Sequence, residues 1–199
     1  NPSCTSSPAQ GHEVAGAAPS GHPHGVNTPR PERRLLLLRH ANAETTLGVL
    51  DHDRELTDRG RRDAHAVGEW LAAREIAVDL VLCSTAIRTR QTWDAVALAG
   101  VPAARVIHLP VIYQGGATGV LQAVVEEAGE AATVVIVGHA PTMPMLADAL
   151  SAGQGSAQAQ AELAAGFPTT GLAVLRYSGE WTDLGPGTAE VETFYIGRG

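Results

Sequence analysis

The chain has 199 residues and a formal net charge of −7, a length that suits one domain and a charge that argues against a nucleic-acid-binding protein. All 14 basic residues are arginines, which excludes lysine Schiff-base chemistry and a lysine general base, and runs of large apolar residues reach only four, whereas a bilayer-spanning helix needs about 20. Two cysteines, Cys4 and Cys83, form neither a disulfide framework nor a C-x-x-C pair, so we expect a cytoplasmic protein with reduced thiols. Because the apolar runs are too short to span a bilayer, we expect no membrane partner.

Residues 1–33 differ in composition from the rest of the chain. They contain six prolines, four glycines and only two large apolar side chains, Val14 and Val26. Such a segment cannot bury enough apolar surface to offset the entropy of ordering it, and it lacks the charged start and apolar stretch of a signal peptide. We therefore interpret residues 1–33 as a disordered or tag-like extension and residues 34–199 as the folded domain.

From residue 34 onward, short apolar runs alternate with segments of helical period. The runs predict strands at 35–38, 80–83, 106–109, 134–137, 172–177 and 190–196. The periodic segments predict helices at about 58–74, 88–98, 119–128 and 142–150, with Thr57 as the N-cap of the first. Residues 151–166 indicate a loop with a weak helix. Apolar strands that alternate with helices predict a three-layer α/β/α sandwich with a largely parallel central sheet, in which the last two strands can form an antiparallel edge.

Arginines and histidines follow three of these strands at the point where each strand ends. Arg39 and His40 follow the first strand, Arg88 lies at the start of the helix after the second, and His139 follows the fourth. Ligands of open α/β sheets bind at the carboxyl ends of the strands, so we expect these side chains to meet. Guanidinium groups match phosphoryl oxygens, and a histidine held by a hydrogen bond at one ring nitrogen can attack phosphorus with the other. The pattern predicts a site for phosphoryl transfer.

Four motifs resemble those of a known family. Residues 37–41 (LLRHA) resemble the R-H-G signature of the histidine phosphatase superfamily, residues 84–92 (STAIRTRQT) resemble its S-x-x-x-R-x-x-Q-T segment, and residues 138–141 (GHAP) resemble its G-H-x-P turn. Residues 51–60 (DHDRELTDRG) are similar to the D-x-x-R-x-L-T-x-x-G stretch of the SixA-like phosphohistidine phosphatase branch. The chain departs from the pattern at Ala41, Thr85 and Ala140, none of which removes a charge. The resemblance covers residues 34–199 and implies the phosphoglycerate mutase-like fold.

The resemblance also implies a role for each matching residue. His40 is expected to be the nucleophile that carries the phosphoryl group. Its expected phosphate-binding partners are Arg39, Arg88 and His139. Because the family uses no metal, we expect no metal and no other cofactor here.

Two assignments near the site stay open at this point. Asp51 is the candidate proton donor to the leaving group, and Asp53 is the alternative. A phosphohistidine leaving group can also depart without a strong acid once its ring is protonated. Arg54 is expected either to contact the substrate phosphate or to hold its own loop.

We therefore expect a metal-independent phosphatase, of bacterial type, that acts through a covalent phosphohistidine. The short segments between the motifs leave few residues for a lid, which favours a bulky substrate such as phosphohistidine on a protein. One alternative is a phosphatase of the same superfamily that acts on small phosphorylated metabolites. The other is a non-catalytic phosphate-binding scaffold domain. The sequence leaves the oligomeric state open.

Overall fold

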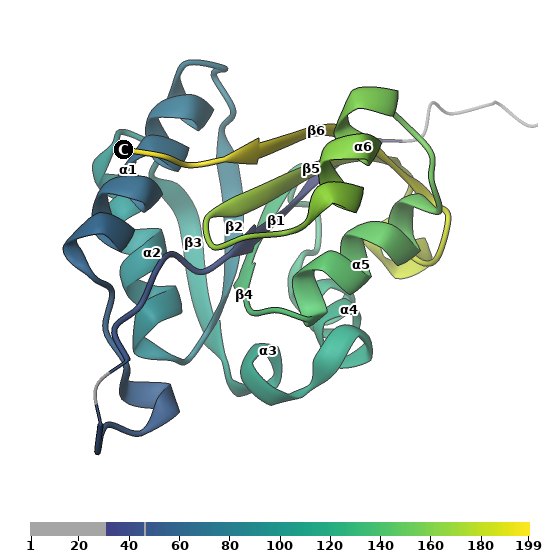
Figure 1. The fold of residues 1–199 in the computed structure, drawn as a ribbon. Coiled ribbons are helices and arrows are strands. Elements are labelled where there is room, and N and C mark those ends of the chain that lie inside the picture. Colours follow the sequence, from purple (N-terminus) through teal and green to yellow (C-terminus); the bar gives the residue numbers. More distant parts are fainter. Residues whose placement is uncertain (1–30, 46) are drawn as a thin grey trace, which may run out of the picture.

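A computed structural model describes residues 31–45 and 47–199 and contains one six-stranded sheet (Figure 1). The strands are β1 (Glu32–Arg39), β2 (Val78–Ser84), β3 (Ala103–Leu109), β4 (Thr133–Gly138), β5 (Gly171–Ser178) and β6 (Ala189–Ile196). Their order in the sheet is β3-β2-β4-β1-β5-β6. The first four are parallel, and β5 is antiparallel to both of its neighbours. The predicted mixed sheet with an antiparallel edge is therefore confirmed.

Helices cover both faces of the sheet (Figure 1). They are α1 (Asp58–Ala72), α2 (Ile87–Leu98), α3 (Pro110–Gln114), α4 (Gly116–Glu127), α5 (Thr142–Ser151) and α6 (Ala157–Ala165), with short 3₁₀ turns η1 (Asp51–Asp53) and η2 (Trp181–Asp183). Among the helices of residues 31–45 and 47–199, none is long and apolar enough to cross a membrane.

Strand β1 is covered on both faces, and for this reason its leucines follow one another instead of alternating with polar residues. Leu35 and Leu37 pack in one core cluster with Val124 of α4. Leu36 and Leu38 pack in a second cluster with side chains of α1 and α2. Successive side chains of a strand point to opposite faces, so a strand between two helical layers buries every residue. All four leucines are at most 1% exposed, which confirms the predicted three-layer arrangement.

The folded part begins earlier than the sequence indicated. Strand β1 starts at Glu32, whereas the expected boundary was residue 34. Arg33 is buried, donates from Nε to the carbonyl of Gly179 over 2.9 Å and forms an ion pair with Glu180 at 2.6 Å. A buried guanidinium needs such partners, and they come from the distant end of the chain. Residues 1–30 lie outside the described residues, so the interpretation of that segment stays an expectation.

Two further differences concern the region after β3. Helix α4 begins at Gly116 rather than at the expected residue 119. The short helix α3 was not predicted at all, because five residues are too few to show a helical period. Pro110 occupies its first turn, where a missing N–H costs nothing.

Candidate active site

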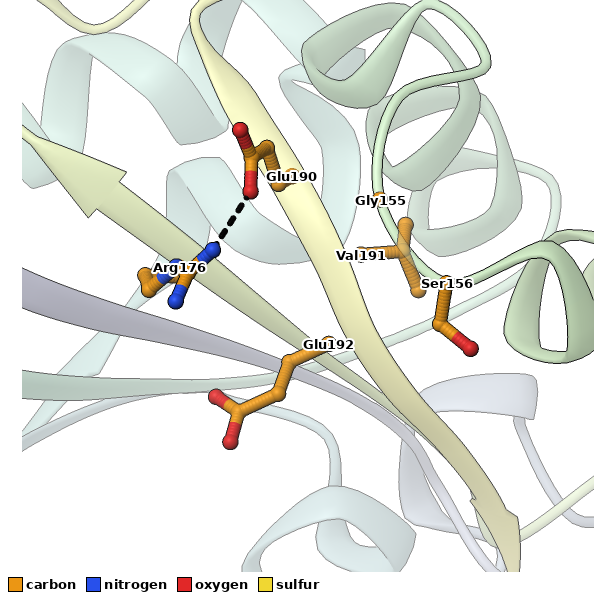
Figure 2. A pocket seen from close by; sticks show the side chains of 6 residues that line it. All are labelled: Gly155, Ser156, Arg176, Glu190, Val191 and Glu192. Carbon is orange, nitrogen blue, oxygen red and sulfur yellow. Dashed lines mark hydrogen bonds and ion pairs between the residues drawn. The ribbon is translucent and has the colours of Figure 1, made fainter.

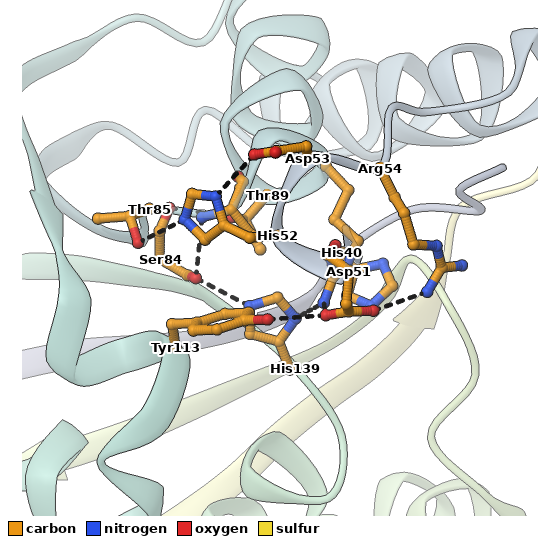
Figure 3. Close-up of polar contacts among 12 residues, drawn as sticks. His40, Asp51, His52, Asp53, Arg54, Ser84, Thr85, Thr89, Tyr113 and His139 are labelled. Carbon is orange, nitrogen blue, oxygen red and sulfur yellow. Dashed lines mark hydrogen bonds and ion pairs between the residues drawn. The ribbon is translucent and has the colours of Figure 1, made fainter. Parts of the chain in front are cut away.

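The carboxyl ends of β1, β2 and β4 bring the expected side chains to one edge of the sheet. His40 and His139 lie close together there, beside Ser84 (Figure 3). The pairing of β1 with β4 continues past the strand ends, since the His40 N–H donates to the carbonyl of Gly138 over 3.0 Å. The ring centroids of His40 and His139 consequently lie 5.2 Å apart. The expectation that these side chains meet at the carboxyl ends of the strands is thus correct for both histidines.

His40 is held in one tautomer by its neighbour. Its Nδ1 lies 2.8 Å from the carbonyl oxygen of Ala41, and because a carbonyl only accepts, Nδ1 carries the proton. Burial of the ring, together with the charges of Arg88 and Arg39, lowers the pKa of His40 to about 4. At neutral pH the ring is therefore uncharged, with its lone pair on Nε2.

His139 is also uncharged and is held between two groups. Its Nδ1 accepts a hydrogen bond from Nη2 of Arg88 (3.3 Å), and its Nε2 then donates to the Ser84 hydroxyl (2.8 Å). Burial, followed by the proximity of His40 and the charge of Arg88, lowers the pKa of His139 to about 3. Ser84, the last residue of β2, therefore fixes the plane of this ring.

The two arginines at this edge are held in place by the burial of Arg88 and by a hydrogen bond from Arg39. Arg88 lies in the first turn of α2 and is a buried residue. Arg39 donates from Nη1 to the carbonyl of Phe167 over 2.8 Å, and burial lowers its pKa. Among the buried side-chain nitrogen and oxygen atoms in the described part of the chain, those without a hydrogen-bond partner are the Nε atoms of these two arginines. Buried donors without a partner are rare, and two at one sheet edge indicate a site that accommodates a further acceptor.

Asp51 approaches the same edge from the turn η1. Its Oδ2 accepts from the Tyr113 hydroxyl at 2.8 Å and from Nη2 of Arg88 at 2.9 Å, and its Oδ1 accepts from Arg54 at 3.0 Å. The hydrogen bond from Tyr113, supported by those from the two arginines, holds the pKa of Asp51 well below its usual range. A general acid requires a pKa near the working pH. In this arrangement Asp51 is a carboxylate and has no proton to donate, which disfavours it as the acid. The identity of the proton donor stays a prediction.

Asp53 and Arg54 lie at the outer side of this turn. Asp53 accepts from Nδ1 of His52 at 3.2 Å, and Nε2 of His52 lies 3.0 Å from the Thr85 hydroxyl. Arg54 donates from Nε to the carbonyl of Glu44 at 2.7 Å as well as to Asp51. These contacts hold the loop of Arg54, and its expected contact with the substrate phosphate stays a prediction.

Comparison with known proteins supports the same family that the motifs resemble. The family model of the histidine phosphatase superfamily (branch 1) matches residues 35–109. The proposed phosphohistidine phosphatase SixA of Nakamurella multipartitia is 38% identical, with a TM-score of 0.75 over 85% of this chain and 99% of that chain. This chain belongs to the histidine phosphatase superfamily, branch 1. The expected fold and family are thereby confirmed.

Two more relatives extend the match. The proposed phosphohistidine phosphatase SixA of Agrobacterium tumefaciens is 31% identical, with a TM-score of 0.66 over 84% of this chain and 99% of that chain. An uncharacterized protein of Mycobacterium tuberculosis is 42% identical over 164 residues, which cover 81% of this chain and all of that protein. This histidine phosphatase domain therefore matches these three relatives over nearly their full length.

The motif at residues 51–60 has a physical basis in the turn between β1 and α1. The Thr57 hydroxyl caps α1 by accepting from the N–H of Gly60 at 2.9 Å, as predicted. A Cβ on Gly60 would lie 2.1 Å from the carbonyl oxygen of Asn42, so only glycine fits there. Leu56 is buried against Ala41, and its N–H donates to the side chain of Gln91 at 2.8 Å. These contacts attach the loop that carries Asp51 to the start of α1.

Tyr113 is the residue of this histidine phosphatase site that sequence reasoning missed. Its ring lies edge-on to His139 at 5.4 Å and to His52 at 5.2 Å, and its hydroxyl binds Asp51. A signal was present, because Tyr113 follows the carboxyl end of β3 within a few residues. The expected phosphate-site residues follow the first, second and fourth strands, and none of them follows the third.

A separate hollow lies over the antiparallel edge of the sheet (Figure 2). It is lined by Gly155, Ser156, Arg176, Glu190, Val191 and Glu192. Its one guanidinium, that of Arg176, is already paired with Glu190 at 2.7 Å. The hollow lacks the converging donors found around His40.

Proposed function

We propose that this protein is a phosphatase that hydrolyses phosphohistidine on proteins through a covalent phosphohistidine at His40. The observation that carries the proposal is the state of the His40 ring. Its Nδ1 is held by the Ala41 carbonyl, so the Nε2 lone pair is available beside two guanidiniums and a second imidazole. This arrangement matches the requirements of nucleophilic attack on phosphorus.

In the first step, Nε2 of His40 attacks the phosphorus atom, and the P–N bond to the substrate histidine breaks. The bonding electrons return to the leaving ring, which departs as neutral imidazole if its other nitrogen is already protonated. Arg39 and Arg88 supply positive charge to the phosphoryl oxygens, as phosphoryl transfer requires. No strong acid is needed for this leaving group, which is consistent with the ionised state of Asp51.

In the second step, a water oxygen attacks phosphorus and the bond to His40 Nε2 breaks. The proton released by the water goes to phosphate or solvent, and His40 recovers its lone pair. A bound phosphoryl dianion raises the pKa of a neighbouring imidazole, so His139 gains the ability to donate to a phosphoryl oxygen. The chemistry is proposed to proceed on arginines and histidines alone, and the residues that the structure describes contain no group of three or more His, Cys, Asp and Glu suited to a metal ion.

The exposure of the rim supports a bulky substrate. The side chain of Asp51 is 55% exposed, and the adjacent Leu50 is 72% exposed. Leu47, Val49 and Leu50, in the segment that leads to Asp51, are all exposed, and a group of exposed apolar side chains favours contact with another protein. The proposed phosphohistidine phosphatases among its relatives support the same substrate class.

Turnover on matched substrates tests the proposal. A phosphohistidine protein and a panel of sugar and nucleotide phosphates are assayed with the wild type, His40→Ala and His65→Gln. We expect the phosphohistidine protein to be preferred, activity to fall by about a thousandfold or more in His40→Ala because the nucleophile is lost, and His65→Gln on the exposed face of α1 to retain activity. A clear preference for one small ester would instead establish a metabolite phosphatase, and phosphate binding without any turnover would establish a scaffold.

A further inference from the structure

The carboxylate of Asp51 lies on the guanidinium that a phosphoryl group needs. Arg88 donates from Nη2 to Oδ2 of Asp51 at 2.9 Å and from Nη1 to the Asp51 backbone carbonyl. The same Nη2 lies 3.3 Å from Nδ1 of His139. Both terminal nitrogens of Arg88 therefore have acceptors before any substrate arrives.

The two partners of this ion pair are buried to very different extents. The Arg88 side chain is 6% exposed, whereas that of Asp51 is 55% exposed. Asp51 belongs to η1, in which no residue is buried, and Leu50 beside it is largely exposed. Segments with few buried contacts open at low free-energy cost. When the pair separates, Asp51 is the side that moves.

We propose that Asp51 is an internal competitor for the phosphoryl group: its carboxylate covers Arg88 in the free protein, and a phosphoryl group binds by displacing it. Two anions cannot share the same donors at short range, because their repulsion grows as water is excluded. Arg54 provides a place for the displaced carboxylate, since it binds Oδ1 at 3.0 Å and is itself attached to the Glu44 carbonyl at 2.7 Å.

The competition makes the site selective against free phosphate. Inorganic phosphate has to break the Asp51–Arg88 pair with its own charge alone, whereas a phosphohistidine on a protein gains further contacts around the leaving group. The inference rests on the proposed function for the position of the phosphoryl group. It assigns Asp51 the task of limiting inhibition by the phosphate product.

Titration calorimetry of the full chain with inorganic phosphate tests the inference. In Asp51→Asn the carboxylate is replaced by an amide of nearly the same shape. We expect the Kd for phosphate to fall by about tenfold to a hundredfold, as when one charge-assisted hydrogen-bonded pair no longer has to be broken. The inhibition constant of phosphate in the turnover assay should fall by a similar factor.

Three further variants make the result specific. Asp53→Asn changes the same charge two residues away, where the side chain contacts His52 and not Arg88, and should leave the Kd for phosphate within about twofold. Tyr113→Phe removes a donor that holds Asp51 Oδ2 and should tighten phosphate binding by about two- to tenfold. It also serves if Asp51→Asn fails to fold. Arg88→Gln should abolish the binding.

The outcomes separate this inference from the proposed function. Unchanged or weaker phosphate binding in both Asp51→Asn and Tyr113→Phe would overturn it, as would full binding in Arg88→Gln or an equal gain in Asp53→Asn. Phosphate binding requires no turnover. Tighter binding in a protein that hydrolyses nothing would retain the competitor and reject the phosphatase.

Discussion

At the scale of single residues, the site consists of two uncharged imidazoles among guanidiniums. The identities of Arg39, His40, Arg88 and His139 could be predicted from their places after strands. The tautomer of His40 could not, because it depends on the direction of the Ala41 carbonyl. The ionised state of Asp51 also escaped prediction, since its hydroxyl partner comes from Tyr113, 62 positions away in the chain.

The protonation of His40 provides a prediction at this scale. Burial and the nearby arginines disfavour the imidazolium, so protonation is expected near pH 4 rather than near 6.5. NMR titration of the imidazole signals, with His40→Asn to assign the His40 ring, measures the midpoint directly. A His40 midpoint near 6.5 would mean that the ring is partly cationic at neutral pH, and this would contradict its description as a ready nucleophile.

At the scale of elements, helix α1 and the loop after β1 form one unit that positions Asp51. Thr57 caps α1 and its hydroxyl donates to the side chain of Asn42 at 2.9 Å, while Gly60 leaves room for the Asn42 backbone. The cap was predictable from local sequence. The need for glycine at position 60 was not, because the atom that excludes a side chain belongs to a segment 18 positions earlier.

The substitution Gly60→Ala tests this contact. In an open helix, alanine would stabilise by up to about 1 kcal/mol relative to glycine. Here its Cβ would meet the Asn42 carbonyl oxygen at 2.1 Å, so we expect a loss of about 1–3 kcal/mol in the free energy of unfolding. Urea unfolding measures the change, with Gly185→Ala as the control, because a Cβ at Gly185 meets nothing within 4 Å. A more stable Gly60→Ala protein would disprove the close approach.

At the scale of the whole molecule, a sheet between two helical layers brings the chemistry to one edge. The apolar runs and helical periods predicted these layers, because burial on both faces leaves no polar positions in the central runs 35–38, 80–83 and 134–137 of β1, β2 and β4. The contact between Asp51 and Arg88 could not be predicted in the same way. It joins a turn without buried residues to the start of a distant helix, and no periodicity encodes such a contact.

His40 is proposed to carry the phosphoryl group during turnover. Rapid mixing with a radiolabelled phosphohistidine protein, followed by an alkaline detergent quench and peptide mapping, tests it most directly. We expect acid-labile, base-stable phosphate on His40 of the wild type and of His65→Gln, and no label in His40→Ala. Phosphate attached to another residue, or hydrolysis at the wild-type rate by His40→Ala, would contradict it.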